Sequence, residues 1–281
     1  MSRKAKVRTK SILSKIFCSL IYIVLFMPIA VVVVNSFNAT TSKPYLTWKG
    51  FTFDWYVKLF ENQSLLTSFG NTMIIALVTT VLSTIIGTLG AIGMYKYKFK
   101  GKGIIDGLLY IPVVIPEIVM GISLLTVFAK VSIPRGMLTL IIAHITFCVP
   151  YVIFNVTPKL KQLDIKLYEA ALDLGCNPKQ AFFKVILPEI SPAILSAFLI
   201  CLTYSIDDFM ISYFNCGTVE TLPIAIYSMT RKKVSPEINA LSAVIFCVIL
   251  AIILISNAAD SRAYRRNQKA IRKAMLDEGG R

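Results

Sequence analysis

Apolar residues of this chain gather in long runs that alternate with short polar segments. A helix needs about 20 mostly apolar residues to cross a lipid bilayer. Six runs are long enough, and we predict membrane-spanning helices at 12–35, 68–95, 104–129, 137–158, 190–214 and 238–258. Helices are expected because they satisfy their own backbone hydrogen bonds where lipid offers no partner. The predicted fold class is an all-α integral membrane protein with six transmembrane helices.

The polar ends of the chain flank this apolar part. We divide the sequence into a basic N-terminus (1–11), one transmembrane domain (12–258) and a basic C-terminal tail (259–281). The first apolar run is too long for a signal peptide, and no small-x-small cleavage site follows it. We therefore expect this run to be retained as a membrane anchor.

Proline and glycine residues modify two of the predicted spans. The span 104–129 contains Pro112 and Pro116, so we expect it to be kinked or broken. The span 68–95 carries small residues that permit close helix packing, at Gly87, Gly90 and Gly93. We therefore expect a close helix neighbour for the second span and an irregular third span.

Composition and charge agree with a membrane protein. The 281 residues are 56% hydrophobic and only 16% charged, whereas soluble domains are about 25% charged. The net charge of +15 could indicate nucleic-acid binding, but 22 of the 30 Lys and Arg residues lie in segments on one side of the predicted membrane. This bias places both termini in the cytoplasm. The expected partner of the basic charge is the lipid bilayer, the tail 259–281 is suited to anionic lipid, and no nucleic acid is predicted.

The cytoplasmic loop between the fourth and fifth predicted spans carries the clearest local pattern. Residues 165–174 are good helix formers, and Gly175 can close that helix in the left-handed conformation. Asn177 is a strong N-cap, Pro178 fits the first helical position, and Gln180 completes a capping box. We expect two short helices joined by a sharp turn, whose apolar residues need a partner groove. Helices lying flat on the bilayer are the alternative from helix physics alone.

This loop resembles the EAA loop of type I ABC importer permeases, whose pattern is Glu-Ala-Ala, three residues, Gly, nine residues, Ile-x-Leu-Pro. The chain departs from the pattern at Val185, where Ile is preferred. It matches the pattern at Glu169, Ala170, Ala171, Gly175, Leu187 and Pro188. The resemblance implies a coupling helix that docks on an ATPase subunit, with Glu169 and Gly175 as its key residues. Pro188 and Pro192 are expected to mark the start of the fifth span.

The motifs of several other classes of protein do not occur in this sequence. No Gly-x-x-x-x-Gly-Lys-Ser/Thr occurs, so ATP is expected on a separate ATPase subunit and this chain is not predicted to be an enzyme. A membrane-embedded enzyme would want His-Glu-x-x-His or Gly-x-Ser-x-Gly, and neither is found. A channel would need no loop for an ATPase. The six scattered cysteines indicate neither a disulfide nor a metal site, and no cofactor is expected.

Ionisable residues inside the predicted spans are candidates for a substrate pathway. With a rise of about 1.5 Å per residue, Glu117, His144, Asp207 and Asp208 fall near one layer beyond the midplane. They could form an acidic constriction that receives a cation, or they could pair among themselves, His144 with Glu117 or an aspartate. Tyr204 lies one turn before Asp208, and its ring suits an alkyl-ammonium ligand through cation–π contact. Interfacial packing is the alternative for Tyr204.

Four further segments resemble the PotC-type permeases of spermidine/putrescine importers. They are Ile-Pro-Val-Val-Ile-Pro-Glu-Ile-Val at 111–119 and the segments 205–212, 221–229 and 234–241. The resemblance implies a polyamine substrate and the plasma membrane of a bacterium. It also implies three partners: a second, PotB-like permease subunit, a PotA-like ATPase dimer and a PotD-like external substrate-binding protein. A related importer for another solute, such as an iron chelate, thiamine or an oxyanion, is the alternative.

The external segment 215–237 is the expected docking region for the binding protein. Its candidate contacts are Tyr227, Arg231, Lys232 and Glu237. A solvated loop without a docking role is the alternative for each of these residues.

Overall fold

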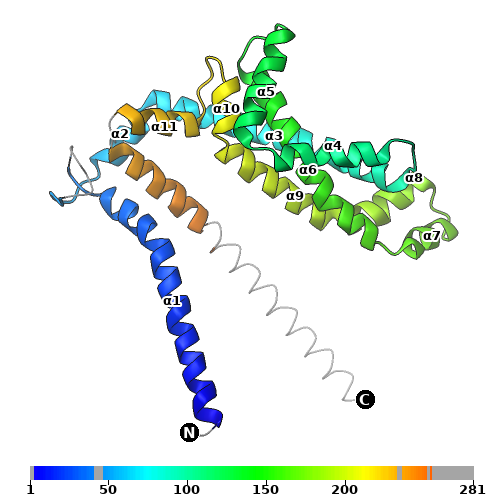
Figure 1. The fold of residues 1–281 in the computed structure, drawn as a ribbon, viewed down its shortest axis with the longest axis horizontal. Coiled ribbons are helices and arrows are strands. Elements are labelled where there is room, and N and C mark those ends of the chain that lie inside the picture. Colours follow the sequence, from blue (N-terminus) through cyan, green and yellow to red (C-terminus); the bar gives the residue numbers. More distant parts are fainter. Residues whose placement is uncertain (1–2, 41–46, 233–235, 252–253, 255–281) are drawn as a thin grey trace. The chain divides into compact units, whose positions relative to one another are not determined.

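The structure is a computed structural model, and it describes residues 3–40, 47–232, 236–251 and 254; the side chains of 3–13, 165 and 232 lie outside the description. The regular secondary structure of these residues is helical, and one isolated bridge joins Asn38 and Phe51 (Figure 1). The prediction of an all-α chain is therefore confirmed for the described residues.

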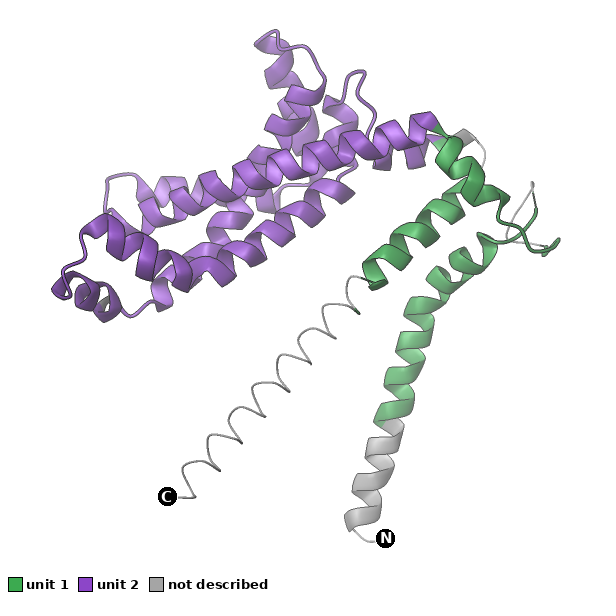
Figure 2. Ribbon diagram, turned by 180° about the vertical axis from the view of Figure 1, so that it is seen from behind, with its two compact units in different colours: residues 1–62, 229–281 green, residues 63–228 purple. Residues whose placement is uncertain are grey.

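Backbone contacts divide the chain into two compact units, coloured separately in Figure 2. One unit contains residues 1–62 and 229–281, and the other contains residues 63–228. The single transmembrane domain at 12–258 stays a prediction.

The unit at the chain ends begins with a long exposed helix. This helix, α1 (Arg3–Asn35), contains Pro28 and leaves the side chains of residues 14–28 exposed. The stretch Ser14–Asn35 of this helix is strongly apolar and has no buried side, which suits a lipid environment. The same unit contains α2 (Asp54–Glu61) and an apolar helix at Pro236–Ala251.

Aromatic residues hold together the segment between α1 and α2. Trp55 is buried and donates its indole N–H to the carbonyl oxygen of Asn38 at 2.8 Å. Phe37 stacks on Phe51 with ring centroids 5.2 Å apart, and the Tyr56 hydroxyl lies 2.7 Å from the Ser36 hydroxyl. These contacts order a segment that the sequence marks only as rich in aromatic residues.

The unit of residues 63–228 holds the remaining elements. They are α3 (Gln63–Lys96), α4 (Lys102–Val114), α5 (Glu117–Lys130), α6 (Met137–Gln162), α7 (Ile165–Asp173), α8 (Pro178–Ala181), the π-helical turn η1 (Phe182–Ile186), α9 (Leu187–Asp207), α10 (Met210–Asn215) and α11 (Leu222–Lys232). The last four residues of α11 belong to the other unit.

Helices α3, α6 and α9 pack side by side and enclose the core of this unit (Figure 1). Gly87 permits the close approach of α3 to α6, because a Cβ atom added there would lie 2.5 Å from the Cβ of Val152. An added Cβ at Gly90 would lie 3.3 Å from Ile153, whereas one at Gly93 would meet nothing within 4 Å. The close packing predicted from these glycines is confirmed for Gly87 and is not found at Gly93.

Two predicted spans are broken. Helices α4 and α5 are bent by 112° at residues 115–116, which confirms the break expected from Pro116. The rise along one straight helix, which was used to place Glu117 in a layer with the other ionisable residues, therefore does not apply across this bend. The continuous helix predicted at 190–214 is also wrong, because α9 ends at Asp207 and α10 begins at Met210.

Helix α9 begins at Leu187 with Pro188 in its first turn, as expected for the start of the fifth span. The second loop helix runs into α9 without a break, which was not expected. Elements α8, η1 and α9 form one helical stretch of 30 residues, Pro178–Asp207. Within η1 the Leu187 amide donates to the Phe182 carbonyl, five residues back. This wider turn directly precedes Pro188, which has no amide hydrogen of its own.

Four described helical stretches are long and apolar enough to cross a membrane: Ser14–Asn35, Gln63–Lys96, Met137–Gln162 and Pro178–Asp207. The bent pair α4 and α5 makes a fifth if it is counted as one broken span. The predicted sixth span begins within Pro236–Ala251, and its last part lies outside the described residues. The tail 259–281 also lies outside them, so the count of six stays a prediction.

Candidate functional site

The break between α9 and α10 is organised by Asp208. This residue leaves the helical conformation, with φ −65° and ψ 120°. Its carboxylate accepts hydrogen bonds from the backbone amides of Ile211 at 3.3 Å and Ser212 at 2.7 Å. The first amides of a helix have no partner within the helix, so the carboxylate satisfies two of them for α10. This capping role was not predicted, although Asp is a common capping residue at helix N-termini.

His144 on α6 completes a buried polar cluster around Asp208. Its Nδ1 lies 2.7 Å from the Ser205 hydroxyl, and its Nε2 lies 3.0 Å from the Ser212 hydroxyl and 3.3 Å from Asp208 Oδ2. We call His144, Ser205, Asp208 and Ser212 the His144 cluster. All four residues are buried, so the cluster joins α6, α9 and α10 inside the protein. The expected pairing of His144 with an aspartate is present.

Two carboxylates near the cluster are exposed. Asp207 is the last residue of α9, and Glu117 is the first residue of α5, directly after the bend. Glu117 lies within electrostatic range of both Asp207 and Asp208. The structure therefore brings three predicted pathway residues together at two helix breaks, with Asp207 and Glu117 open and Asp208 enclosed.

Aromatic rings lie beside these carboxylates. Tyr204 is 41% exposed, and its ring centroid lies 4.8 Å from that of Tyr151 and 5.8 Å from that of Phe147. Tyr151 is in turn within electrostatic range of Glu117. Rings of this kind attract a ligand cation through their electron-rich faces.

Tyr151 and Tyr204 also line a groove of about 490 Å³ between α6 and α9. Polar groups in the groove come from Asn155, Ser196 and Thr203, and aliphatic wall comes from Leu199 and Ile200. Sequence reasoning missed Tyr151 and Asn155. Their four-residue spacing, continued from Phe147, places all three on one face of α6 and could have indicated it.

The predicted loop turn has the expected local geometry. Asp164 caps α7 by accepting from the Lys166 amide at 3.0 Å. Gly175 has φ +87° in the left-handed region and donates to the Leu172 carbonyl at 2.9 Å, while Cys176 donates to the Ala171 carbonyl at 3.0 Å. These two bonds form a Schellman motif that ends the helix.

The start of α8 also follows the prediction. Asn177 Oδ1 accepts from the Gln180 amide at 2.8 Å, and Gln180 Oε1 accepts from the Asn177 amide at 3.0 Å. The capping box is confirmed, with Pro178 at the first helical position.

The EAA residues divide into anchored and exposed groups. Ala171 is buried, and Leu187 packs against the core. Glu169, Ala170, Gly175 and Pro188 are exposed. Large apolar side chains stand beside them in solvent, with Leu174 87% and Phe183 63% exposed. An exposed apolar surface of this kind is typical of a protein-binding site. Leu174 belongs to this surface and was not predicted from the sequence pattern.

The candidate docking residues have mixed surroundings. In the unit of residues 63–228, the Tyr227 ring lies 4.8 Å from the Phe209 ring. In the other unit, Arg231 is exposed and Glu237 accepts a hydrogen bond from Asn62 at 3.3 Å. The side chain of Lys232 lies outside the described residues.

Comparison with known proteins now decides the family. Residues 83–269 match the family model described as the inner membrane component of binding-protein-dependent transport systems. This chain belongs to that family. Its members are permease subunits of ABC transporters and are not themselves the ATPase. Membership and the several apolar helices place the chain in a bacterial plasma membrane, which it crosses more than once.

Several curated relatives of this permease are similar over most of their length. The spermidine/putrescine transport system permease protein PotC of Haemophilus influenzae is 39% identical over 241 residues, covering 85% of this chain and 93% of PotC. PotC of Escherichia coli K12 is also 39% identical, over 85% of this chain and 90% of its own length. The putrescine permease PotI of E. coli K12 is 34% identical over 89% of this chain and 91% of PotI.

Solved structures show the same fold at lower identity. A chain of a bacterial ABC transporter involved in the import of the acidic polysaccharide alginate matches with a TM-score of 0.70 at 17% identity, over 93% of this chain and 98% of that chain. A chain of the MetNI methionine ABC transporter matches with a TM-score of 0.54 at 18% identity, over 76% and 99%.

Proposed function

We propose that this permease is the PotC-like subunit of an ATP-driven importer of spermidine or putrescine. The observation that carries the proposal is the 39% identity to PotC over 85% of the chain. The chemistry of the site supports it, because carboxylates beside aromatic rings suit an alkyl polyamine with several positive charges.

The proposed topology has six spans and both termini in the cytoplasm. The distribution of Lys and Arg supports this orientation. The broken α4 and α5 pair serves as the third span, and the helix beginning at Pro236 serves as the sixth.

The substrate pathway of the proposal runs past Asp207, Glu117 and Tyr204. Their side chains are exposed, and charged groups at membrane depth avoid lipid. This face is therefore assigned to the surface that meets a second, PotB-like permease subunit. Asp208 is enclosed by the His144 cluster, so its role is to shape the break that presents Asp207.

The proposed coupling runs through one continuous helix. The exposed loop residues Glu169, Ala170, Gly175 and Pro188 contact a PotA-like ATPase dimer, which binds ATP, while Ala171 and Leu187 anchor the loop. Because Pro178–Asp207 is a single helical stretch, a displacement of the loop reaches Asp207 at its far end. The loop thus transmits movement of the ATPase to the pathway and does not itself contact substrate.

The proposed source of substrate is a PotD-like binding protein outside the cell. It docks on the external segment 215–237, with contacts at Tyr227, Arg231, Lys232 and Glu237.

Uptake of labelled spermidine and putrescine by the reconstituted four-part complex tests the function. We expect Asp207→Asn to lower uptake by about tenfold, since one lost charge contact of about 1.4 kcal/mol corresponds to that factor. Asp106→Asn, which removes a carboxylate from α4 away from the groove, is the matched control.

Undiminished uptake by Asp207→Asn would overturn the assignment of this residue. A wild-type complex that imports thiamine, an iron chelate or an oxyanion but no polyamine would overturn the substrate and support the alternative importer.

A further inference from the structure

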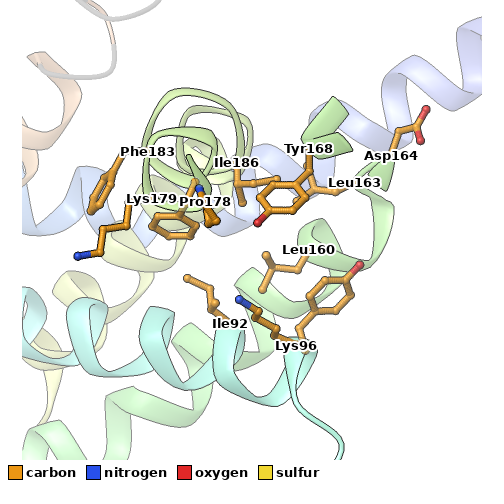
Figure 3. A pocket seen from close by; sticks show the side chains of 12 residues that line it. Ile92, Lys96, Leu160, Leu163, Asp164, Tyr168, Pro178, Lys179, Phe183 and Ile186 are labelled. Carbon is orange, nitrogen blue, oxygen red and sulfur yellow. The ribbon is translucent and has the colours of Figure 1, made fainter. Parts of the chain in front are cut away.

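A second cavity lies beside the coupling loop, far along the chain from the acidic site. It has a volume of about 420 Å³ and is lined by the ends of α3 and α6, by α7 and by the α8–η1 segment (Figure 3). Its walls are mostly apolar, with Ile92, Leu160, Leu163 and Ile186 among the residues that line it. An apolar cavity of this kind can hold an amphipathic ligand if charged side chains at its rim bind the ligand's polar end.

The rim does carry charge, and it is basic. Lys96 and Lys179 line the cavity, and within the described residues neither forms a salt bridge. The one acidic residue of the lining, Asp164, turns its carboxylate away from the cavity in Figure 3 and uses it to cap α7. The Lys96 ammonium lies 5.8 Å from the centroid of the Tyr97 ring, and neither lysine has a carboxylate partner in the described part of the chain. The cavity therefore combines a mostly apolar lining with two lysines that no described acidic group neutralises.

Further lysines lie close to these lining residues in the sequence. Lys98, Lys100 and Lys102 follow α3, Lys161 lies in the last turn of α6, and Lys166 lies in the first turn of α7. Lys159, also in the last turn of α6, is paired with Glu189 at 2.9 Å. On the proposed topology these residues lie at the cytoplasmic surface of the membrane, where anionic phospholipids present phosphate groups. Apolar chain and anionic headgroup are combined in one molecule at that level.

The geometry points to this cavity as a binding site for one anionic phospholipid of the cytoplasmic leaflet. An acyl chain occupies the apolar part between Ile92, Leu160 and Leu163, and the phosphate lies between Lys96 and Lys179. Because Lys179 belongs to α8 and Lys96 to α3, the bound lipid ties the coupling loop to the helix bundle. The inference rests on the proposed cytoplasmic placement of the loop and not on the identity of the substrate.

The test is native mass spectrometry of the full-length permease. The protein is mixed in detergent with phosphatidylglycerol or phosphatidylcholine, and the lipid that stays bound after the detergent is removed is measured. We expect wild type to retain one phosphatidylglycerol in preference to phosphatidylcholine. Lys96→Gln with Lys179→Gln is expected to weaken retention by about 25-fold, since each lysine near an anionic headgroup contributes a factor of about five. The matched control is Lys98→Gln with Lys100→Gln, which removes two charges outside the cavity.

A cavity-filling variant, Leu163→Phe, separates the cavity from general charge attraction. We expect this variant to retain less phosphatidylglycerol, while the ATPase subunits still co-purify with the assembled complex. Equal loss in both lysine pairs, or full retention by Leu163→Phe, would overturn the site. Loss of the ATPase by Leu163→Phe with lipid retention unchanged would also overturn it and would assign the cavity to the ATPase. Polyamine uptake enters none of these measurements, so a failure here is distinct from a failure of the proposed function.

Discussion

At the residue scale, the carboxylate of Asp208 is buried in the protein and is not accessible to a ligand. Its side chain is 4% exposed and that of His144 is 3% exposed. A buried ionised group costs several kcal/mol unless it is paired and hydrogen-bonded. The two amides and the imidazole around Asp208 supply that compensation, and so they fix where α9 ends and α10 begins.

We therefore expect His144→Ala to destabilise the permease by about 3 kcal/mol, because it leaves the buried carboxylate without its partner. The measurement is thermal unfolding of the detergent-purified chain. Adding Asp208→Asn is expected to restore part of the loss, since the amide oxygen still caps α10 and no charge is buried. Strictly additive losses in the double variant would contradict the pairing.

The neighbouring Asp207 shows the opposite behaviour at the same scale. The two aspartates are adjacent and identical in the sequence, yet one is exposed and the other is buried. The end of α9 falls between them, so their side chains leave the backbone in different directions. Sequence reasoning treated them as one pair because it assumed a continuous helix.

At the element scale, the connection between α7 and α8 depends on the left-handed turn at Gly175. A Cβ atom there would meet nothing within 4 Å. The requirement for glycine is therefore one of backbone conformation, with φ at +87°, and not of space.

We expect Gly175→Val to strain this turn by about 1–2 kcal/mol and to displace the loop from its partner. In the reconstituted complex, ATP hydrolysis should then continue with less polyamine imported per ATP. Gly175→Asn is the matched control, because Asn tolerates the left-handed region. An unchanged ratio of uptake to hydrolysis in the valine variant would refute the role of the turn.

The helix that follows the loop lacks a break at Pro188, although α9 does begin there as predicted. Pro188 normally interrupts a helix because it lacks an amide hydrogen and crowds the preceding turn. Here the π-helical turn η1 directly before it widens the backbone, so α8 and α9 remain one stretch. A π turn has no reliable sequence signature, and the prediction of a separate span followed from the proline alone.

At the scale of the whole molecule, the bundle of residues 63–228 depends on the close contact of α3 with α6. Gly87 faces the Val152 side chain and the Val149 carbonyl, and an added Cβ would lie 2.5 Å and 3.1 Å from their atoms. A backbone carbonyl on a packed helix cannot move aside as a flexible side chain can.

We expect Gly87→Ala to force α3 and α6 apart and to lower stability by about 2 kcal/mol. Gly93→Ala on the same helix is the matched control, since nothing lies within 4 Å of its added Cβ. Thermal unfolding of the two purified variants gives the comparison. Similar unfolding midpoints would show that the packing does not depend on Gly87.

The sequence by itself determined the features that depend on neighbouring residues. The apolar runs predicted the long helices, and the caps at Gly175 and Asn177 were predicted correctly because their hydrogen bonds span only a few residues. The break at Pro116 belongs to the same class, since proline acts on its own backbone.

Only the tertiary structure decided the features that join distant segments. His144 and Ser205 are 61 residues apart in the chain, and Gly87 and Val152 lie on different helices. The partner of His144, the enclosure of Asp208 and the exposure of Asp207 follow from how α6, α9 and α10 pack. A local pattern records which residues can bury or pair, but the packing of helices selects which of them meet.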